Sequence, residues 1–392
     1  MKKFLAYSLV VMTLSIILQG NILYAQPSVK DSNLQVKAFV SGFTFPTSML
    51  FLDKNNIMIL EKEGTVRLVT NGVLSPQPLV SLNVDTKNER GLLGIERIGD
   101  NVFLYATVKN GQVMNRIFKY TLTAGPKLTN QEVFKNLPGT PGTNHQGGKL
   151  AVSNDGYLYS VTGELQRNGK DQNIKNGPDP DFSGAILKTN PEDGSPAPNN
   201  PFKTNNSKDP INWYQAYGIR NSFGLGVDPV TGNLWDTENG EDSHDEINMV
   251  VPGFNSGWKL VTGPISGSGI TQNDLVNFPN SKYKDPVLSF VDSFGITDIE
   301  FLNSSKLGAD YANNAFVGDY GHGNLYRFQL NADRTGFKFD NPGLEDHVVN
   351  NSGELNSIIF GKGFAGITDI KTGTDGYLYV LSFNDGTIYK IS

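Results

Sequence analysis

The chain has 392 residues, a net charge of −6 at neutral pH and no cysteine. The lack of cysteine excludes disulfides, thiolate catalysis and cysteine-ligated metals. The charge is mildly acidic and no dense basic patch occurs, so nucleic acid is not an expected partner.

The amino terminus has the layout of an export signal. Lys2 and Lys3 precede an apolar run over 4–18, and the small residue Ala25 comes just before Gln26. We therefore expect residues 1–25 to be a cleaved signal peptide and 26–392 to form a single domain. The alternative is a retained membrane anchor, but the run is shorter than the ~20 residues that a spanning helix needs. Export predicts a secreted, periplasmic or cell-surface location, with no transmembrane span after cleavage.

Short extended segments recur along the whole mature chain. They are predicted at 34–40, 48–51, 57–60, 65–69, 102–108, 115–121, 150–153, 157–161, 185–189, 225–228, 233–236, 246–250, 298–301, 315–318, 324–330 and in pairs over 367–391. Asp155-Gly156-Tyr157-Leu158-Tyr159 is repeated as Asp375-Gly376-Tyr377-Leu378-Tyr379. An Asp-Gly turn before alternating apolar residues indicates a β-hairpin.

The recurrence of this unit predicts an all-β fold, a radial array of small sheets. We expect a six-bladed β-propeller of four-stranded antiparallel blades, with both chain ends in one blade, while seven or eight short blades stay open. The longest polar connections are predicted at 138–144, 166–182, 191–210 and 262–284. The segment His145-Gln146-Gly147-Gly148 borders two of them, and long loops on a rigid ring often carry binding and catalytic residues.

Seven motifs along the chain occur in a family-specific order. They are Glu89-Arg90-Gly91-Leu92-Leu93-Gly94, His145-Gln146-Gly147-Gly148, Gly184-Ala185-Ile186-Leu187-Lys188, Asn200-Pro201-Phe202, Tyr217-Gly218-Ile219-Arg220-Asn221, Asp245-Glu246-Ile247-Asn248 and Gly257-Trp258. With these motifs in this order, the mature chain resembles the soluble glucose/sorbosone dehydrogenase family, whose members are six-bladed propeller quinoproteins. The resemblance implies a dehydrogenase that uses pyrroloquinoline quinone (PQQ) and calcium. It would oxidise the anomeric hydroxyl of an aldose or oligosaccharide to the lactone, with an external electron acceptor.

The resemblance also implies roles for individual residues. His145 matches the family's proton acceptor, and Arg220 with Asn221 matches the residues that contact the quinone. Glu89 stands where sugar-oxidising members often carry glutamine, and Glu164 where many carry aspartate. From the residues alone, His145 could equally cap a turn and Arg220 could pair with a surface carboxylate.

The acidic loop 238–246 is the candidate calcium site, because calcium prefers carboxylate and carbonyl oxygens. The resemblance implies that the backbone carbonyls of Gly240 and Glu241 hold the cofactor's calcium, with Glu241 replacing the usual proline. Asp245 and Glu246 would serve a structural ion or simply close the turn.

The chain departs from the family at the residues that hold the carboxylates of PQQ. A lysine and two arginines are replaced by Gly321, Gly366 and Thr368, and His322 or Lys371 is the candidate to supply part of the lost charge. Each charge-assisted hydrogen bond contributes about 1.5–3 kcal/mol, so their joint loss would weaken cofactor binding by several powers of ten. The alternative function is therefore a non-catalytic, calcium-stabilised propeller that binds carbohydrate or another ligand.

Overall fold

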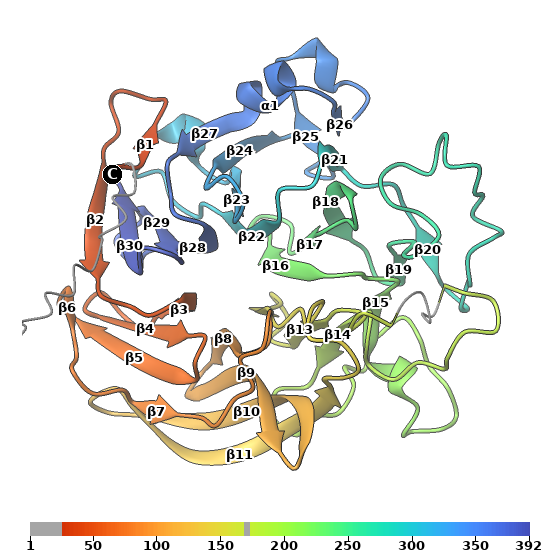
Figure 1. Cartoon of the computed structure of the whole chain (residues 1–392), viewed down its shortest axis with the longest axis horizontal. Coiled ribbons are helices and arrows are strands. Elements are labelled where there is room, and N and C mark those ends of the chain that lie inside the picture. The colour runs from red at the N-terminus through yellow and green to blue at the C-terminus, as the bar shows by residue number, and fades with distance from the viewer. Residues whose placement is uncertain (1–25, 168–172) are drawn as a thin grey trace, which may run out of the picture.

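The computed structural model describes residues 26–167 and 173–392, so the predicted signal peptide lies outside the described residues. No helix in these two ranges is long and apolar enough to cross a membrane. Within them, strands dominate, and they form six sheets arranged around a central axis (Figure 1).

The sheets follow one another along the chain, and each begins with the strand nearest the axis. The first contains β3 (Pro46–Phe51), β4 (Asn56–Glu61), β5 (Thr65–Thr70), β6 (Val73–Leu74) and β7 (Val80–Ser81). The second contains β8 (Leu92–Ile98), β9 (Asn101–Asn110), β10 (Gln112–Thr123) and β11 (Lys127–Pro138). The third contains β12 (Leu150–Val152), β13 (Leu158–Thr162), β14 (Ala185–Thr189), β15 (Tyr214–Tyr217), β19 (Phe254–Asn255) and β20 (Lys282–Tyr283).

The other three sheets complete the ring. The fourth contains β16 (Ser222–Val227), β17 (Leu234–Glu238), β18 (Ser243–Val250), β21 (Leu288–Asp292) and β26 (Val348–Val349). The fifth contains β22 (Ile296–Phe301), β23 (Ala315–Asp319), β24 (Leu325–Leu330), β25 (Phe337–Lys338), β27 (Ile359–Lys362) and β1 (Ser28–Val29). The sixth contains β28 (Ile367–Thr372), β29 (Leu378–Ser382), β30 (Thr387–Ile391) and β2 (Val36–Ser41). The described helices are η1 (Pro210–Trp213), η2 (Ala309–Tyr311), η3 (Pro342–Leu344) and α1 (Ser352–Ile358).

The ring closes through its innermost strands and through the two ends of the chain. The innermost strands contact one another in the cyclic order β3, β8, β12, β16, β22, β28 and back to β3. Strand β2 pairs antiparallel with β30, so the second and the last strands of the described chain lie in one sheet, whereas β1 pairs with β27 in the fifth sheet (Figure 1). The predicted propeller fold is confirmed, and the predicted sharing of one sheet by the chain ends holds for β2 and β30 but not for β1.

The prediction of purely four-stranded, antiparallel sheets is wrong in detail. Four sheets have five or six strands, and β19 pairs in parallel with both β15 and β20, as β26 does with β21. The extra strands are two residues long and flank the long connections, which return along the outside of the ring. Two long strands, β8 and β11, were not predicted.

Burial explains why the middle strands read as continuous apolar runs. Strand β29 lies between β28 and β30, and all five of its residues are buried. The apolar clusters join neighbouring sheets: Met58 and Leu60 of the first sheet pack with Leu92 and Leu104 of the second. Because apolar side chains pack between neighbouring sheets, each innermost strand is held in a fixed position around the central axis.

Candidate functional site

A cavity of about 570 Å³ lies at one end of the central axis. Five of its lining residues each hold the second position of an innermost strand, and these are Thr47, Leu93, Phe223, Thr297 and Thr368. Lys149, which directly precedes β12, contributes from the remaining sheet. The cavity volume is in the range that small-molecule ligands occupy in proteins.

The wall of the cavity nearest the axis contains a buried ion cluster. The Lys149 ammonium lies 2.8 Å from a carboxylate oxygen of Asp298 and 2.6 Å from one of Asp369. Asp369 also accepts hydrogen bonds from the hydroxyl of Ser48, at 3.0 Å, and the amide of Met49. Both aspartates are fully buried, so the charge of Lys149 is already neutralised and is not free for a ligand.

His145 does not itself line this cavity but lies next to Glu89, which does, and its backbone conformation is strained. Its φ angle is 58°, in the left-handed region, which is uncommon for a residue other than glycine and clusters at functional sites. Its ring Nδ1 is hydrogen-bonded to the carboxylate of Glu164, and the side chains of the two residues are 14% and 3% exposed. The imidazole therefore keeps one nitrogen engaged and one nitrogen available.

The carboxylate of Glu164 is stabilised in its charged form. Burial alone would raise its pKa, but the hydrogen bond with His145 and those from the amides of Arg167, at 2.6 Å, and Gln166, at 2.9 Å, lower the pKa below its ordinary value. An ionised Glu164 accepts a hydrogen bond, so Nδ1 of His145 is the protonated nitrogen. The other ring nitrogen, Nε2, is then the proton acceptor.

Glu89 joins the histidine to the fourth sheet and also lines the cavity. One of its carboxylate oxygens accepts hydrogen bonds from the amide of His145, at 2.7 Å, and from the side chain of Asn221, at 3.1 Å. Burial raises the pKa of Glu89, although His145 opposes that effect. The structure thus brings Glu89, His145, Glu164 and Asn221 together, as the resemblance implies.

Arg220 lies next to this group, because its carbonyl accepts the amide of Glu164 at 2.8 Å. Its guanidinium donates to the carbonyl of Asn239 at 2.8 Å and lies over the ring of Trp258, 5.2 Å from the ring centroid. It lines a hollow of only about 10 Å³, and is absent from the lining of the large cavity, whereas Asn239 lines both. Its Nε has no hydrogen-bond partner, so the side chain retains one unused donor.

In the candidate calcium loop, the side chains are engaged with the protein. The carboxylate of Asp245 accepts the amides of Gly240, Phe294, Gly295 and Ile296 at 2.8–3.2 Å, which closes the turn. Glu246 is buried, its pKa is raised well above the ordinary value by burial, and it accepts the amide of Gly263. Glu241 is exposed. In residues 26–167 and 173–392, no group of three or more His, Asp or Glu side chains has a metal-binding arrangement.

The positions that carry cations in the family have little space for them here. A Cβ atom on Gly321 would lie 2.6 Å from the carbonyl oxygen of Phe294, and one on Gly366 would lie 3.1 Å from the ring of Tyr320. The φ angle of Gly366 is +82°, which also favours glycine. Thr368 donates its hydroxyl to the carbonyl of Pro46 at 2.9 Å.

Aromatic side chains, which the sequence interpretation missed, line this part of the cavity. They are Phe45, Phe223, Tyr320 and Phe383. Phe45 and Phe223 lie just before or in an innermost strand, whereas Tyr320 and Phe383 directly follow the second strands β23 and β29.

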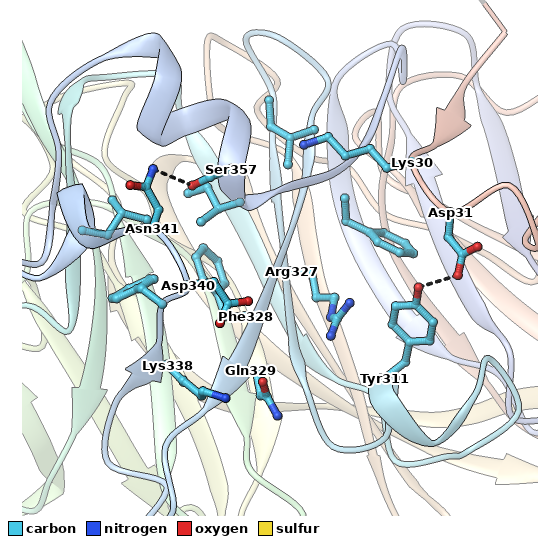
Figure 2. A pocket seen from close by; sticks show the side chains of 15 residues that line it. Lys30, Asp31, Tyr311, Arg327, Phe328, Gln329, Lys338, Asp340, Asn341 and Ser357 are labelled. Carbon is cyan, nitrogen blue, oxygen red and sulfur yellow. Dashed lines mark hydrogen bonds between the residues drawn. The ribbon is translucent and has the colours of Figure 1, made fainter.

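A second cavity, of about 440 Å³, lies on the outer side of the fifth sheet (Figure 2). Residues from β24, η3 and α1 line it together with Lys30 and Asp31, and Asp31 accepts the hydroxyl of Tyr311 at 2.6 Å (Figure 2). None of the predicted site residues lines it.

The chain is similar to proteins of several bacteria. It is 25% identical to the aldose sugar dehydrogenase YliI of Escherichia coli over 95% of both chains. It is 30% identical to an uncharacterized protein of Synechocystis over 62% of this chain, and it spans 65% of that protein's length.

Solved structures with the same fold cover nearly the whole chain. A Thermus thermophilus protein described as an oxidoreductase (glucose dehydrogenase) matches with a TM-score of 0.73 and 27% identity, over 92% of this chain and 100% of that one. The PQQ-bound aldose sugar dehydrogenase of Streptomyces coelicolor matches with a TM-score of 0.68 and 23% identity, over 93% and 100%. The family model for glucose/sorbosone dehydrogenase matches residues 43–390, and with this match the chain belongs to that family.

Proposed function

We propose that the protein is an exported sugar dehydrogenase that oxidises the anomeric hydroxyl of an aldose or oligosaccharide to the lactone. The observation that carries the proposal is the hydrogen bond between His145 and an ionised Glu164 beside the central cavity. Family membership supplies the substrate class. We also propose that residues 26–392 form one domain, in which each of the six sheets is one blade.

The chain's own residues account for the proton in this reaction. The anomeric hydroxyl gives its proton to Nε2 of His145 while hydride leaves the same carbon for an electron acceptor, so no free alkoxide forms. Glu164 holds the imidazole in the tautomer that accepts this proton and stabilises the imidazolium that results. Asn221 and Glu89 fix the backbone around His145 through the hydrogen bonds described above.

PQQ, the cofactor that the resemblance implies, does not fit the rim of this cavity. Its carboxylates need cations, but Gly321 and Gly366 are closely packed and Thr368 is bonded to the backbone. Of the described lining residues only two are basic: Lys149 is neutralised by two aspartates, and Lys62 donates to the carbonyl of Thr86 at 2.6 Å. We therefore derive no step through PQQ.

A calcium ion remains part of the proposal. The carbonyls of Gly240 and Glu241 would bind it, because the side chains of Asp245 and Glu246 are already engaged with backbone amides. Calcium prefers such oxygen ligands, and bound here it would stiffen the loop that follows β17.

The second candidate function is a non-catalytic propeller that binds carbohydrate. The missing cations favour it, since a ring that lost its cofactor would keep its shape and its cavity. It predicts sugar binding without turnover.

Turnover measurements on the mature protein separate the two functions. Aldoses and oligosaccharides should be oxidised to lactones in the presence of quinone and dye acceptors, and His145→Gln should lower kcat by about 10²–10⁴ with unchanged thermal stability. Arg116→Gln, a change at a half-buried arginine outside the cavity, serves as the control. If calorimetry shows sugar binding but no acceptor supports oxidation, the binding function is correct and the dehydrogenase proposal is wrong.

A further inference from the structure

Three aromatic rings stand together at the rim of the central cavity, and we call them the aromatic wall: Phe45, Tyr320 and Phe383. The ring of Phe383 is central, with its centroid 5.1 Å from that of Phe45 and 5.6 Å from that of Tyr320. All three rings line the cavity. They come from segments next to β3, β23 and β29, on the half of the ring that does not carry His145.

Keeping the aromatic wall at this place costs the protein stability. Phe45 and Tyr320 are each 45% exposed, although large aromatic side chains are normally buried. Phe45 also has a φ angle of 47°, and a bulky residue in the left-handed region costs about 1–3 kcal/mol. Its backbone is held in this conformation by a 2.9 Å hydrogen bond from the amide of Lys62. Exposed aromatic rings around a cavity, one of them on a strained backbone, indicate a ligand that covers them.

Tyr320 of the aromatic wall leaves little space for a cation at position 366. The ring of Tyr320 packs 3.1 Å from the position that a Cβ atom of residue 366 would take, so an arginine there would displace it. Glu89 adds a carboxylate to the cavity, and Lys149 is already paired with two aspartates. The cavity therefore offers aromatic surface, in which the rings of Phe45 and Phe383 are inclined at 31° and those of Tyr320 and Phe383 at 71°, and Lys62 is the one unpaired cation among its described lining residues.

We infer that the aromatic wall binds a planar quinone ring without carboxylate groups, and that this ring is the electron acceptor of the dehydrogenase proposed above. A flat ring packs against the face of one wall ring and the edge of its neighbour, while the sugar occupies the half of the cavity lined by Glu89 and Gly147, next to His145. In the reaction the sugar loses a hydride from its anomeric carbon and a proton from its hydroxyl, and becomes the lactone. The quinone takes up that hydride and one proton and becomes the hydroquinone, so two electrons and two protons are conserved.

The test compares two probes of similar shape and different charge. Naphthoquinone is flat and uncharged, while naphthoquinone sulfonate carries an anionic group on the same ring system. Equilibrium dialysis of the mature protein gives the Kd of each probe, and PQQ is measured in the same way. Phe383→Leu and Tyr320→Leu remove wall rings, and Phe39→Leu removes a 37% exposed ring on β2 that does not line the cavity.

We expect naphthoquinone to bind at least tenfold more tightly than its sulfonate and more tightly than PQQ. Each wall variant should weaken naphthoquinone binding about twofold to tenfold, because an aromatic contact contributes about 0.5–1.5 kcal/mol. Phe39→Leu should leave the Kd unchanged.

The inference is wrong if PQQ or the sulfonate binds more tightly than naphthoquinone, or if the two wall variants bind it as the wild type does. The inference rests on the proposed function for the role of the quinone as electron acceptor, but the two can fail separately. Sugar oxidation supported by PQQ alone overturns the inference and leaves the dehydrogenase standing. Wall-dependent naphthoquinone binding without oxidation of any sugar leaves the ring site standing and overturns both the dehydrogenase and the acceptor role.

Discussion

Gly366 provides a direct test of how the aromatic rim is packed. Its φ angle is +82°, where an alanine costs about 1–2 kcal/mol of backbone strain. A methyl group there would lie 3.1 and 3.2 Å from two ring carbons of Tyr320 and 3.2 Å from Nδ2 of Asn384, which is closer than van der Waals contact. Since Tyr320 is 45% exposed, its ring can move outward, but it then loses its contact with Phe383, about 0.5–1.5 kcal/mol. We expect Gly366→Ala to lower the free energy of unfolding by about 1.5–3.5 kcal/mol in total.

Urea titration of the mature protein measures this change, and the chain offers a matched control. Gly99 has a φ angle of +59° and no atom within 4 Å of its would-be Cβ, so Gly99→Ala reports backbone strain alone. In a Tyr320→Ala background, the cost of Gly366→Ala should fall toward that of Gly99→Ala, and the contact with the amide nitrogen of Asn384 should account for the remaining difference. If Gly366→Ala costs no more than the control in the wild-type protein, the ring does not occupy that space and the reasoning is refuted.

The remaining predictions concern buried charge and calcium. Lys149→Met should destabilise the protein by about 3–5 kcal/mol at most, because it removes the cation that bridges buried Asp298 and Asp369 and leaves them with Lys371, 3.9 Å from Asp369, and an unchanged urea midpoint would contradict that role. Burial raises the pKa of Glu89 in the folded protein, so protonated Glu89 contributes its full stabilisation below about pH 4, and this contribution is lost as the pH rises through the folded-state pKa. The variant Glu89→Gln should therefore have a higher melting temperature than the wild type at about pH 7 but not at about pH 4. Calcium at 100 times its Kd should add about 2.7 kcal/mol to unfolding stability, and an equal melting temperature with calcium and with chelator would argue against the site at Gly240 and Glu241.

The repeated Asp-Gly turns made the propeller fold predictable from the sequence. Strands β8 and β11 were not predicted, and each omission has a physical reason. Strand β11 is long, but most of its residues are exposed, so it carries no apolar alternation. Strand β8 begins with Leu92-Leu93-Gly94, and a glycine usually weakens a strand prediction. Here the glycine is required, because a Cβ atom on Gly94 would lie 2.1 Å from the carbonyl oxygen of Gly148 on the neighbouring innermost segment. That contact is between sheets, and a local pattern does not contain it.

The candidate site was predictable only in part for the same reason. Glu89, His145 and Asn221 are joined by hydrogen bonds across 56 and 132 positions of sequence, and the family resemblance, not the spacing, brought them together in the prediction. Phe45 and Phe383 lie at opposite ends of the chain, and their contact follows from ring closure.

The two halves of the cavity rest on different sheets, and this separates their roles. The base group of His145, Glu164, Glu89 and Asn221 is carried by segments next to β8, β12, β13 and β16, whereas the aromatic wall is carried by segments next to β3, β23 and β29. The two halves are nevertheless joined across the first and second sheets, because Thr47 donates its hydroxyl to the carbonyl of Leu92 at 2.7 Å and the amide of Leu92 donates to the carbonyl of Lys62 at 3.0 Å. The proton acceptor and the aromatic rim therefore use different side chains on a connected backbone. A substitution in the rim should change ring contacts directly and should reach His145 only through these backbone hydrogen bonds.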